Sequence, residues 1–249
     1  MTRLLRSELL KQRTTRTNAL LLAWMIALIA LIVLLHVFSF NAQTLAQRPN
    51  QLKVVGWGTG IGSLFAALLG AMSITNEIRH GTIRPTFLAT PNRTRVIAAK
   101  LAAGGLAGIA VGLAAEALTA GVEAAGFAVR GIHITISGGD YVQLLAGGAA
   151  AAALFAAIGV GVGAIIRNQI GTVVGLCVWL LLIETTLIGN VPSAGKFAPG
   201  ASAGALAGAI QTQTATNLLT PALGALLLVA YAAACGAAGA LVTARRDIA

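Results

Sequence analysis

Six long apolar stretches constrain the fold of this chain more than any other feature. A helix needs about 20 mostly apolar residues to cross the hydrocarbon core of a bilayer, and each stretch reaches that length. The runs are continuously apolar rather than alternating, which favours helices over the strands of a barrel. We therefore predict an all-α membrane protein with six transmembrane helices. Their expected ranges are 19–40, 54–75, 96–120, 141–166, 170–190 and 222–243.

Charge is scarce and is confined mostly to the gaps between these runs. Only 10% of the residues are charged, against about 25% in an ordinary soluble domain. The net charge of +10 does not indicate nucleic-acid binding, because the basic residues are spread over gaps rather than gathered on one face. Thirteen Lys and Arg fall on one side of the predicted membrane and four on the other. The positive-inside rule then predicts cytoplasmic termini at both ends.

The N-terminal segment 1–18 places leucines at helical spacing among basic residues. This pattern is typical of an amphipathic helix that lies on the inner leaflet. The alternative is a plain basic flank of the first span. The apolar run 19–40 has 22 residues, which exceeds the 7 to 15 of a signal peptide, so we expect it to remain as the first span. The spans and their connections then form one transmembrane domain, 19–249.

A short apolar segment separates the fifth and sixth spans. Residues 197–210 are too few to cross the membrane, and Pro192, Pro199 and Pro221 bracket them. Polar residues follow as far as position 214. We predict a re-entrant segment over 197–214 on the outer side, with an irregular external loop as the alternative.

No motif for catalysis, nucleotide binding or metal binding is complete. Gly195-Lys196 lacks the glycine and the Ser or Thr that a phosphate-binding loop requires around it. The three histidines are scattered, and Cys177 and Cys235 lie singly inside apolar runs. We expect no catalytic residues, no metal and no bound cofactor, and hence a chain that is not an enzyme by itself.

Three ionisable residues enter the predicted spans: His36, Glu116 and Glu184. At about 1.5 Å rise per residue, all three lie roughly 21 to 30 Å from the cytoplasmic ends of their helices, near the outer surface. One interpretation is placement in the membrane interface at little cost. The other is that some of them line an outward exit for a substrate.

The most polar part of the chain is the connection 76–95 between the second and third spans. Thr82 is expected to cap a short helix, Pro85 fits its first turn, and Pro91 ends it. Phe87 and Leu88 are expected to give this helix an apolar face. Glu77 can pair with the basic residues that follow it in the loop, although exposed pairs contribute only about 0 to 1 kcal/mol. Such a structured loop indicates a docking partner.

The residues of this loop resemble a known pattern. They are similar to the loop between spans two and three in membrane subunits of the type-2 family of ATP-binding cassette (ABC) transporters, where a Glu, Gly-Thr, a Leu, a Pro and a basic residue occur in this order. The positions that carry the resemblance are Glu77, Arg79, Gly81, Thr82, Leu88, Pro91, Arg93 and Lys100. The six spans, the N-terminal helix and the re-entrant segment extend the resemblance over the whole chain.

The resemblance implies a permease subunit that couples a translocation pathway to a separate ATPase subunit through a coupling helix. It also implies ATP and Mg²⁺ on that partner, a second permease copy or paralogue, a bacterial inner membrane, and export of an amphipathic drug, lipid or peptide. The implied contacts with the ATPase are Glu77, Arg79, Gly81, Thr82, Arg84, Leu88, Pro91 and Arg93. An autonomous secondary transporter or channel, and a sensory or immunity protein without transport activity, are the alternatives.

Overall fold

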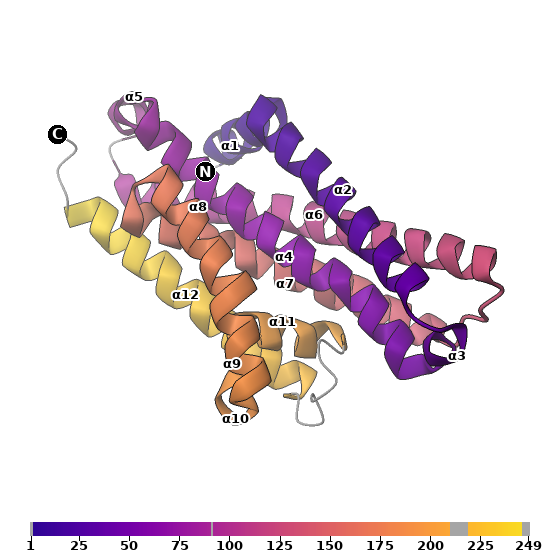
Figure 1. Ribbon diagram of the computed structural model, residues 1–249. Helices are drawn as coiled ribbons and strands as arrows, with labels where there is room; N and C mark the ends of the chain where they lie inside the picture. Colours follow the sequence, from indigo (N-terminus) through magenta and orange to yellow (C-terminus); the bar gives the residue numbers. More distant parts are fainter. Residues whose placement is uncertain (1, 91, 210–218, 246–249) are drawn as a thin grey trace.

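The computed structural model describes residues 2–90, 92–209 and 219–245, and all regular secondary structure in those ranges is helical (Figure 1). Six helical segments are long and apolar enough to cross a membrane, which confirms the number of spans predicted from sequence. They are α2 (Arg16–Ser39), α4 (Arg48–Arg79), α6 (Arg93–Arg130), α7 (Gly138–Ile166), the composite α8 (Gln169–Cys177), η1 (Val178–Ile183) and α9 (Glu184–Asn190), and α12 (Pro221–Arg245).

Five short helices complete the described chain. They are α1 (Thr2–Thr14), α3 (Ala42–Leu45), α5 (Ile83–Ala89), α10 (Pro192–Gly195) and α11 (Pro199–Ala207). Helices α1 and α5 lie near one end of the bundle, whereas α3, α10 and α11 lie toward the other end (Figure 1). The apolar segment 197–210 thus forms a helix over nine residues, and Gly208 ends it in the left-handed conformation, at φ 70°. Residues 210–214 of the predicted re-entrant segment lie outside the described residues.

Helix α4 is the centre of the bundle. In its most apolar stretch 89% of the residues are buried, against 22% in α2 and 17% in the α8–α9 composite. Its predicted range contains no charged residue and many small ones, so neighbouring helices can approach from all sides. Helices α2, α6 and α7 pack directly on it. The remaining long helices keep large apolar side chains exposed for lipid.

Small residues set the spacing between α4 and α7. A Cβ atom on Gly70 would collide with the carbonyl of Ala156, and one on Gly159 would collide with the carbonyl of Ala67. The two backbones are therefore in direct contact, as small-residue faces allow in membranes. This closely packed pair forms the core of the bundle.

Candidate functional site

The connection 76–95, called the elbow below, is a helical excursion between α4 and α6. Helix α4 ends at Arg79, and Gly81 turns the chain at φ 70°, a conformation that favours glycine. Helix α5 follows, and the Asn92 side chain caps α6 by accepting from the Arg95 amide at 3.0 Å. Thr82 occupies the N-cap position of α5 but makes no capping bond, contrary to the expectation from sequence. Pro91 lies outside the described residues.

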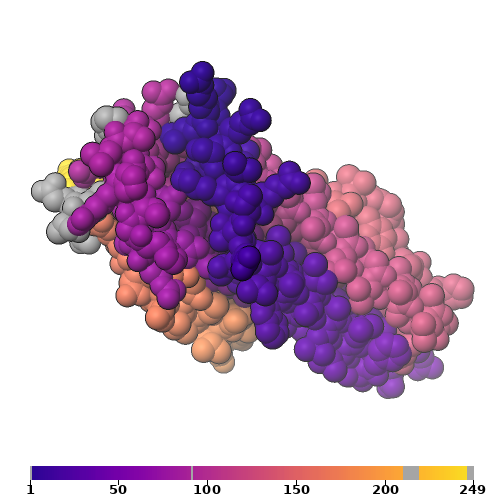
Figure 2. Space-filling view, turned by 90° about the horizontal axis from the view of Figure 1, so that it is seen from above, coloured from indigo at the N-terminus to yellow at the C-terminus, as the bar shows by residue number. Residues whose placement is uncertain are grey.

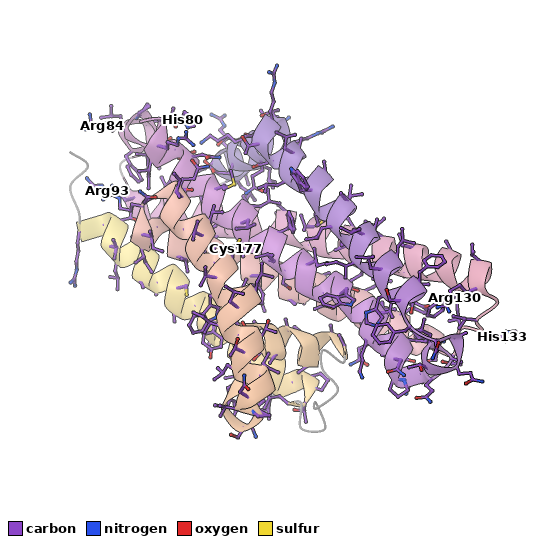
Figure 3. All side chains as sticks on the ribbon, in the orientation of Figure 1. His80, Arg84, Arg93, Arg130, His133 and Cys177 are labelled. Atoms are coloured by element: carbon purple, nitrogen blue, oxygen red, sulfur yellow. The ribbon has the colours of Figure 1, made fainter. Side chains whose placement is uncertain are left out.

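Helix α5 has one buried face and one exposed face. Ile83 and Phe87 are 3% and 8% exposed and pack with the ends of α4 and α6. Leu88 is 83% exposed, the highest value among the large exposed hydrophobic side chains of the described chain. The prediction of a shared apolar face for Phe87 and Leu88 is wrong, because consecutive residues of a helix point about 100° apart. Arg84 is exposed and lies at the outer edge of the molecule (Figure 3).

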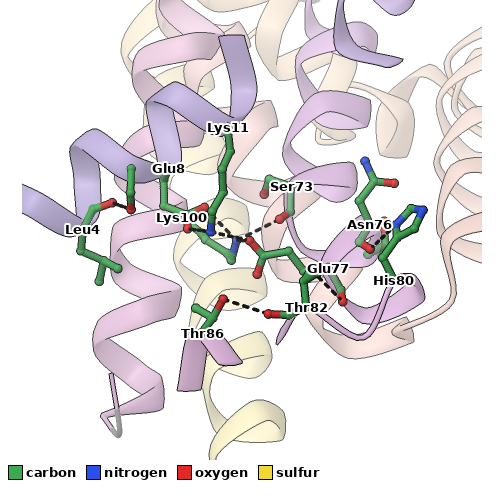
Figure 4. Close-up of polar contacts among 12 residues, drawn as sticks. Leu4, Glu8, Lys11, Ser73, Asn76, Glu77, His80, Thr82, Thr86 and Lys100 are labelled. Carbon is green, nitrogen blue, oxygen red and sulfur yellow. Dashed lines mark hydrogen bonds and ion pairs between the residues drawn. The ribbon is translucent and has the colours of Figure 1, made fainter. Parts of the chain in front are cut away.

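A buried ion cluster lies at the base of the elbow (Figure 4). Lys100 of α6 is fully buried and pairs with Glu8 of α1 at 2.8 Å and with Glu77 of α4 at 2.9 Å. Lys11 of α1 pairs with the same two carboxylates, at 2.7 and 2.8 Å. Lys100 also donates to the Ser73 carbonyl at 2.9 Å. Two acids and two bases thus join three helices with no net charge.

The cluster changes the interpretation of Glu77. Its carboxylate points into the protein and pairs with Lys11 and Lys100, rather than with the basic residues that follow it in the loop. Glu77 is only 8% exposed, so it holds the elbow in place instead of presenting a charge to a partner. Figure 2 shows the N-terminal segment, in indigo, lying beside the magenta segment that contains the elbow.

The cluster residues on α1 have shifted pKa values. Burial alone would raise the pKa of Glu8, but Lys100 and Lys11 outweigh burial, and the pKa lies below its ordinary value. Burial alone would lower the pKa of Lys11, but its hydrogen bonds to Glu77 and Glu8 raise it. Both groups therefore stay charged across the neutral range, and the ion pairs persist there.

Sequence reasoning missed the role of α1 in this site. The signal was present, because Glu8 is the only acidic residue before Glu77 and lies in an otherwise basic helix. Such an acid is expected to pair with a basic residue, and Lys11 of the same helix is one partner. The second partner, Lys100, depends on a contact across 92 positions of sequence.

The remaining predicted contact residues divide into two groups. Arg93 faces inward, because it donates to the Thr243 carbonyl of α12 at 3.3 Å and lies 5.7 Å from the centre of the Phe87 ring. Arg79 is exposed and donates to Gln169 of α8 at 3.1 Å. Arg84, Leu88 and Thr82 are exposed. A partner would therefore meet the outer face of α5, while Glu77 and Arg93 tie the elbow to α1 and α12.

The three ionisable residues predicted near the outer surface are not brought together. Glu116 is 1% exposed and accepts from Thr59 at 2.5 Å, between α6 and α4. Glu184 is 2% exposed and accepts from the Ala201 amide at 3.0 Å, at the first turn of α11. Both carboxylates are enclosed by protein, in contrast to the interfacial interpretation. His36 is partly exposed and accepts from the Trp57 indole at 3.4 Å.

A fifth buried acid, Glu123 of α6, was not predicted, because its position lies beyond the expected third span. It is fully buried, and neither carboxylate oxygen has a hydrogen-bond partner among the described residues. The reason is that α6 continues for ten residues past the predicted end at 120. Length alone could not reveal this, since residues 121–130 are less apolar than a typical span.

A cavity of about 260 Å³ lies between α2, α4, η1, α9 and α11. Glu184 lines it, whereas Glu116 and His36 do not. His36 contacts a lining residue, because it accepts the hydrogen bond of the Trp57 indole.

A scan against models of protein families and a search of curated proteins each found no match to this chain. Among the described residues no group of three His, Cys, Asp or Glu side chains is arranged to hold a metal ion.

Proposed function

We propose that this chain is the membrane subunit of an ABC transporter and that the outer face of α5 is the coupling surface for a separate ATPase subunit. The partner would hold ATP and Mg²⁺. A second copy or a paralogue would complete the translocation pathway, and the cargo would be an amphipathic molecule exported across a bacterial inner membrane. Both termini would then be cytoplasmic, as the charge asymmetry favours.

The observation that carries this proposal is the exposure of Leu88 on a helix whose other face is firmly packed. A seven-residue helix has no stability of its own in water, so its packing must hold it in shape. Arg84 precedes this side chain by one turn of α5 and is also exposed, as is Arg79 at the end of α4. An apolar knob with basic neighbours suits a groove of mixed apolar and acidic character on a partner.

The anchoring of the elbow supports a coupling role. Ile83 and Phe87 connect α5 to the ends of α4 and α6 through apolar contacts. The ion cluster connects the same place to α1, and Arg93 connects it to α12. A displacement of α5 would move these packed helices together, which is how a rigid element transmits motion. In this mechanism Glu77 and Lys100 are positioning residues.

Two further features fit the same proposal. Helix α1 directs Leu10, 61% exposed, away from the bundle and would lie on the inner leaflet as an interfacial helix. Helix α11 packs on α7 and α12 at the other end and would be the described part of a re-entrant segment.

The test is to look for an adjacent reading frame that encodes a soluble ATPase with a phosphate-binding loop, and to measure whether that ATPase co-purifies with this chain. We expect the wild-type chain to retain that ATPase, and we expect Leu88→Ser to weaken the complex by about 1.5 to 3 kcal/mol, because a buried leucine contributes about that much. Leu10→Ser is the matched control, since it removes an exposed leucine from α1 and should leave the complex intact. Equal binding by both variants would show that α5 is not the docking surface.

The buried acids favour a second candidate, an ion-coupled secondary transporter. Glu116, Glu123 and Glu184 are enclosed acids, and ionisable residues inside membrane proteins often mark ion pathways. This candidate predicts that the chain alone, in vesicles without any ATPase, moves protons or sodium ions with its cargo. The permease proposed above would move no cargo without its ATPase and would not move protons or sodium ions with the cargo.

A further inference from the structure

The cavity beside α4 has apolar walls and few polar groups. Leu28 and Ile32 of α2 form one wall, and Leu180 and Leu181 of η1 form the opposite wall. Helix α4 lines a third side of the cavity. The two charged residues that line the cavity are Lys53 of α4 and Glu184 of α9. Such a combination, a mostly apolar surface with a few placed polar groups, is typical of small-molecule sites.

Two polar atoms in this cavity lack partners. The Oε2 atom of Glu184 and the Oγ atom of Ser63 are buried, and neither has a hydrogen-bond partner among the described residues. The residues are 2% and 3% exposed. Buried polar atoms in folded proteins are almost always paired, so two such atoms on the lining of one cavity favour a polar group of a ligand there. The other carboxylate oxygen of Glu184 is already fixed by the Ala201 amide.

The backbone before Glu184 is unusual in a way that serves the cavity. Residues 178–183 form the π-helix η1, the only π-helix among the described segments, and Glu184 follows it directly. A π-turn inserts an extra residue and so rotates the residues after it relative to those before it; such turns are frequent at functional sites. Here the six residues of η1 all remain unburied, whereas Glu184 turns inward and is buried.

An aromatic ring completes the lining. Trp57 lies on α4 next to Gly56 and Gly60, which leave the cavity open on that side. Its indole nitrogen donates to His36 at 3.4 Å, which restricts the rotation of the ring. A carboxylate and a restrained tryptophan together are a common means of binding an organic cation, through a charge-assisted hydrogen bond and a cation–π contact.

We propose that this cavity binds an amphipathic amine. The protonated nitrogen would donate to Glu184 Oε2 and to Ser63 Oγ and make a cation–π contact with the Trp57 ring, and the apolar body would lie between α2 and η1. The inference rests on the proposed function only in that the amine would be the cargo. Binding itself requires no ATPase. A failure to bind the amine therefore leaves the coupling proposal intact, and a failure to bind the ATPase leaves this one intact.

The two charged residues of the cavity favour ligands of opposite sign. The charge of Lys53 favours an anion, but Lys53 is partly exposed and therefore solvated, whereas Glu184 is enclosed. The enclosed group has the stronger need for a partner, because water cannot reach it. Removal of the Glu184 charge should therefore weaken amine binding, and removal of the Lys53 charge should strengthen it.

The experiment uses the purified full-length chain in lipid nanodiscs and tritiated 1-naphthylmethylamine as the probe, with the neutral alcohol and 1-naphthylacetate as competitors. We expect Glu184→Gln to weaken amine binding about tenfold or more and Trp57→Leu to weaken it about threefold to fivefold. Lys53→Gln should strengthen it by about twofold or more. Glu116→Gln is the matched control, because it alters an equally buried acid outside the cavity, and binding should not change.

Several results would overturn the proposal. They are no saturable binding of the amine by the wild type, equal affinity in Glu184→Gln and the wild type, or tighter binding of 1-naphthylacetate than of the amine. Because Glu184 also caps α11, its variant can unfold. In that event Trp57→Leu and Lys53→Gln decide, and unchanged affinity in both of these folded variants refutes the amine site.

Discussion

Replacement of Lys100 by methionine tests whether the ion cluster holds α1 on the elbow. Methionine has a similar length and fits the apolar surroundings, so the change removes mainly the charge. Glu8 and Glu77 then each keep only Lys11 as an ion-pair partner. The Ser73 carbonyl loses the hydrogen bond that Lys100 donates. The Lys11 side chain is 46% exposed, whereas the Lys100 side chain is 0% exposed. The remaining pairs are therefore screened by water more strongly than the lost ones.

The size of the effect follows from this burial. Removal of one partner of a buried ion pair costs about 3 to 5 kcal/mol, and we expect the lower end, about 3 kcal/mol, because Lys11 continues to pair with both acids. Since about 1.4 kcal/mol corresponds to a factor of ten, undocking of α1 should become about a hundredfold more frequent. Lys11→Met removes a half-exposed charge, so we expect about 1 kcal/mol or less there, roughly a fivefold effect.

The assay is amide hydrogen exchange of α1 in the full chain in nanodiscs. The account predicts a large loss of protection in Lys100→Met, a small one in Lys11→Met, and partial recovery in the double variant Lys100→Met with Glu8→Gln, which no longer buries an unpaired acid on α1. Wild-type protection in Lys100→Met, or an equal effect of the two lysine variants, would refute the reasoning.

Docking of α1 should also depend on pH at both extremes. The pKa of Glu8 is lowered, so its contribution to the stability of the docked α1 is complete above its ordinary pKa of 4.5 and is lost as the pH falls through the lower folded-state pKa. The pKa of Lys11 is raised, so its contribution is complete below its ordinary pKa of 10.5 and is lost only as the pH rises through the higher folded-state pKa. Exchange protection of α1 that changes between pH 6 and 9 would contradict this. Gly159→Ala should destabilise the α4–α7 pair by about 1 to 3 kcal/mol through its collision with Ala67, whereas Gly105→Ala, where a Cβ meets open space, should not. Thermal unfolding of the two variants side by side checks this, and equal midpoints would be the contrary result.

Apolar length predicted the spans well because it reports a single local property. The fifth and sixth spans were placed within one or two residues of the observed helices. The ends of α4 and α6 were not, since these helices continue beyond the apolar range by packing on other protein, at Gln51 and Glu123 for example. Local hydrophobicity cannot report such support.

The candidate site could be predicted only in part, for a related reason. The short helix of the elbow was predicted from Thr82, Pro85, Pro91 and the polar composition, and α5 is present at Ile83–Ala89. The inward orientation of Glu77 was not, because it depends on where α1 folds back. The role of Glu184 likewise depends on a π-turn and on the position of α11, neither of which has a clear signature in one sequence.

A photocrosslink from position 88 tests whether the outer face of α5 contacts an ATPase. Leu88 is replaced by p-benzoylphenylalanine in intact cells, with Leu10 replaced likewise as the control, and the adducts are identified by mass spectrometry. The account predicts an adduct at position 88 with a nucleotide hydrolase that carries a phosphate-binding loop, and no such adduct at position 10. Adducts at position 88 that include no nucleotide hydrolase, in cells that express the chain at its natural level, would contradict this assignment.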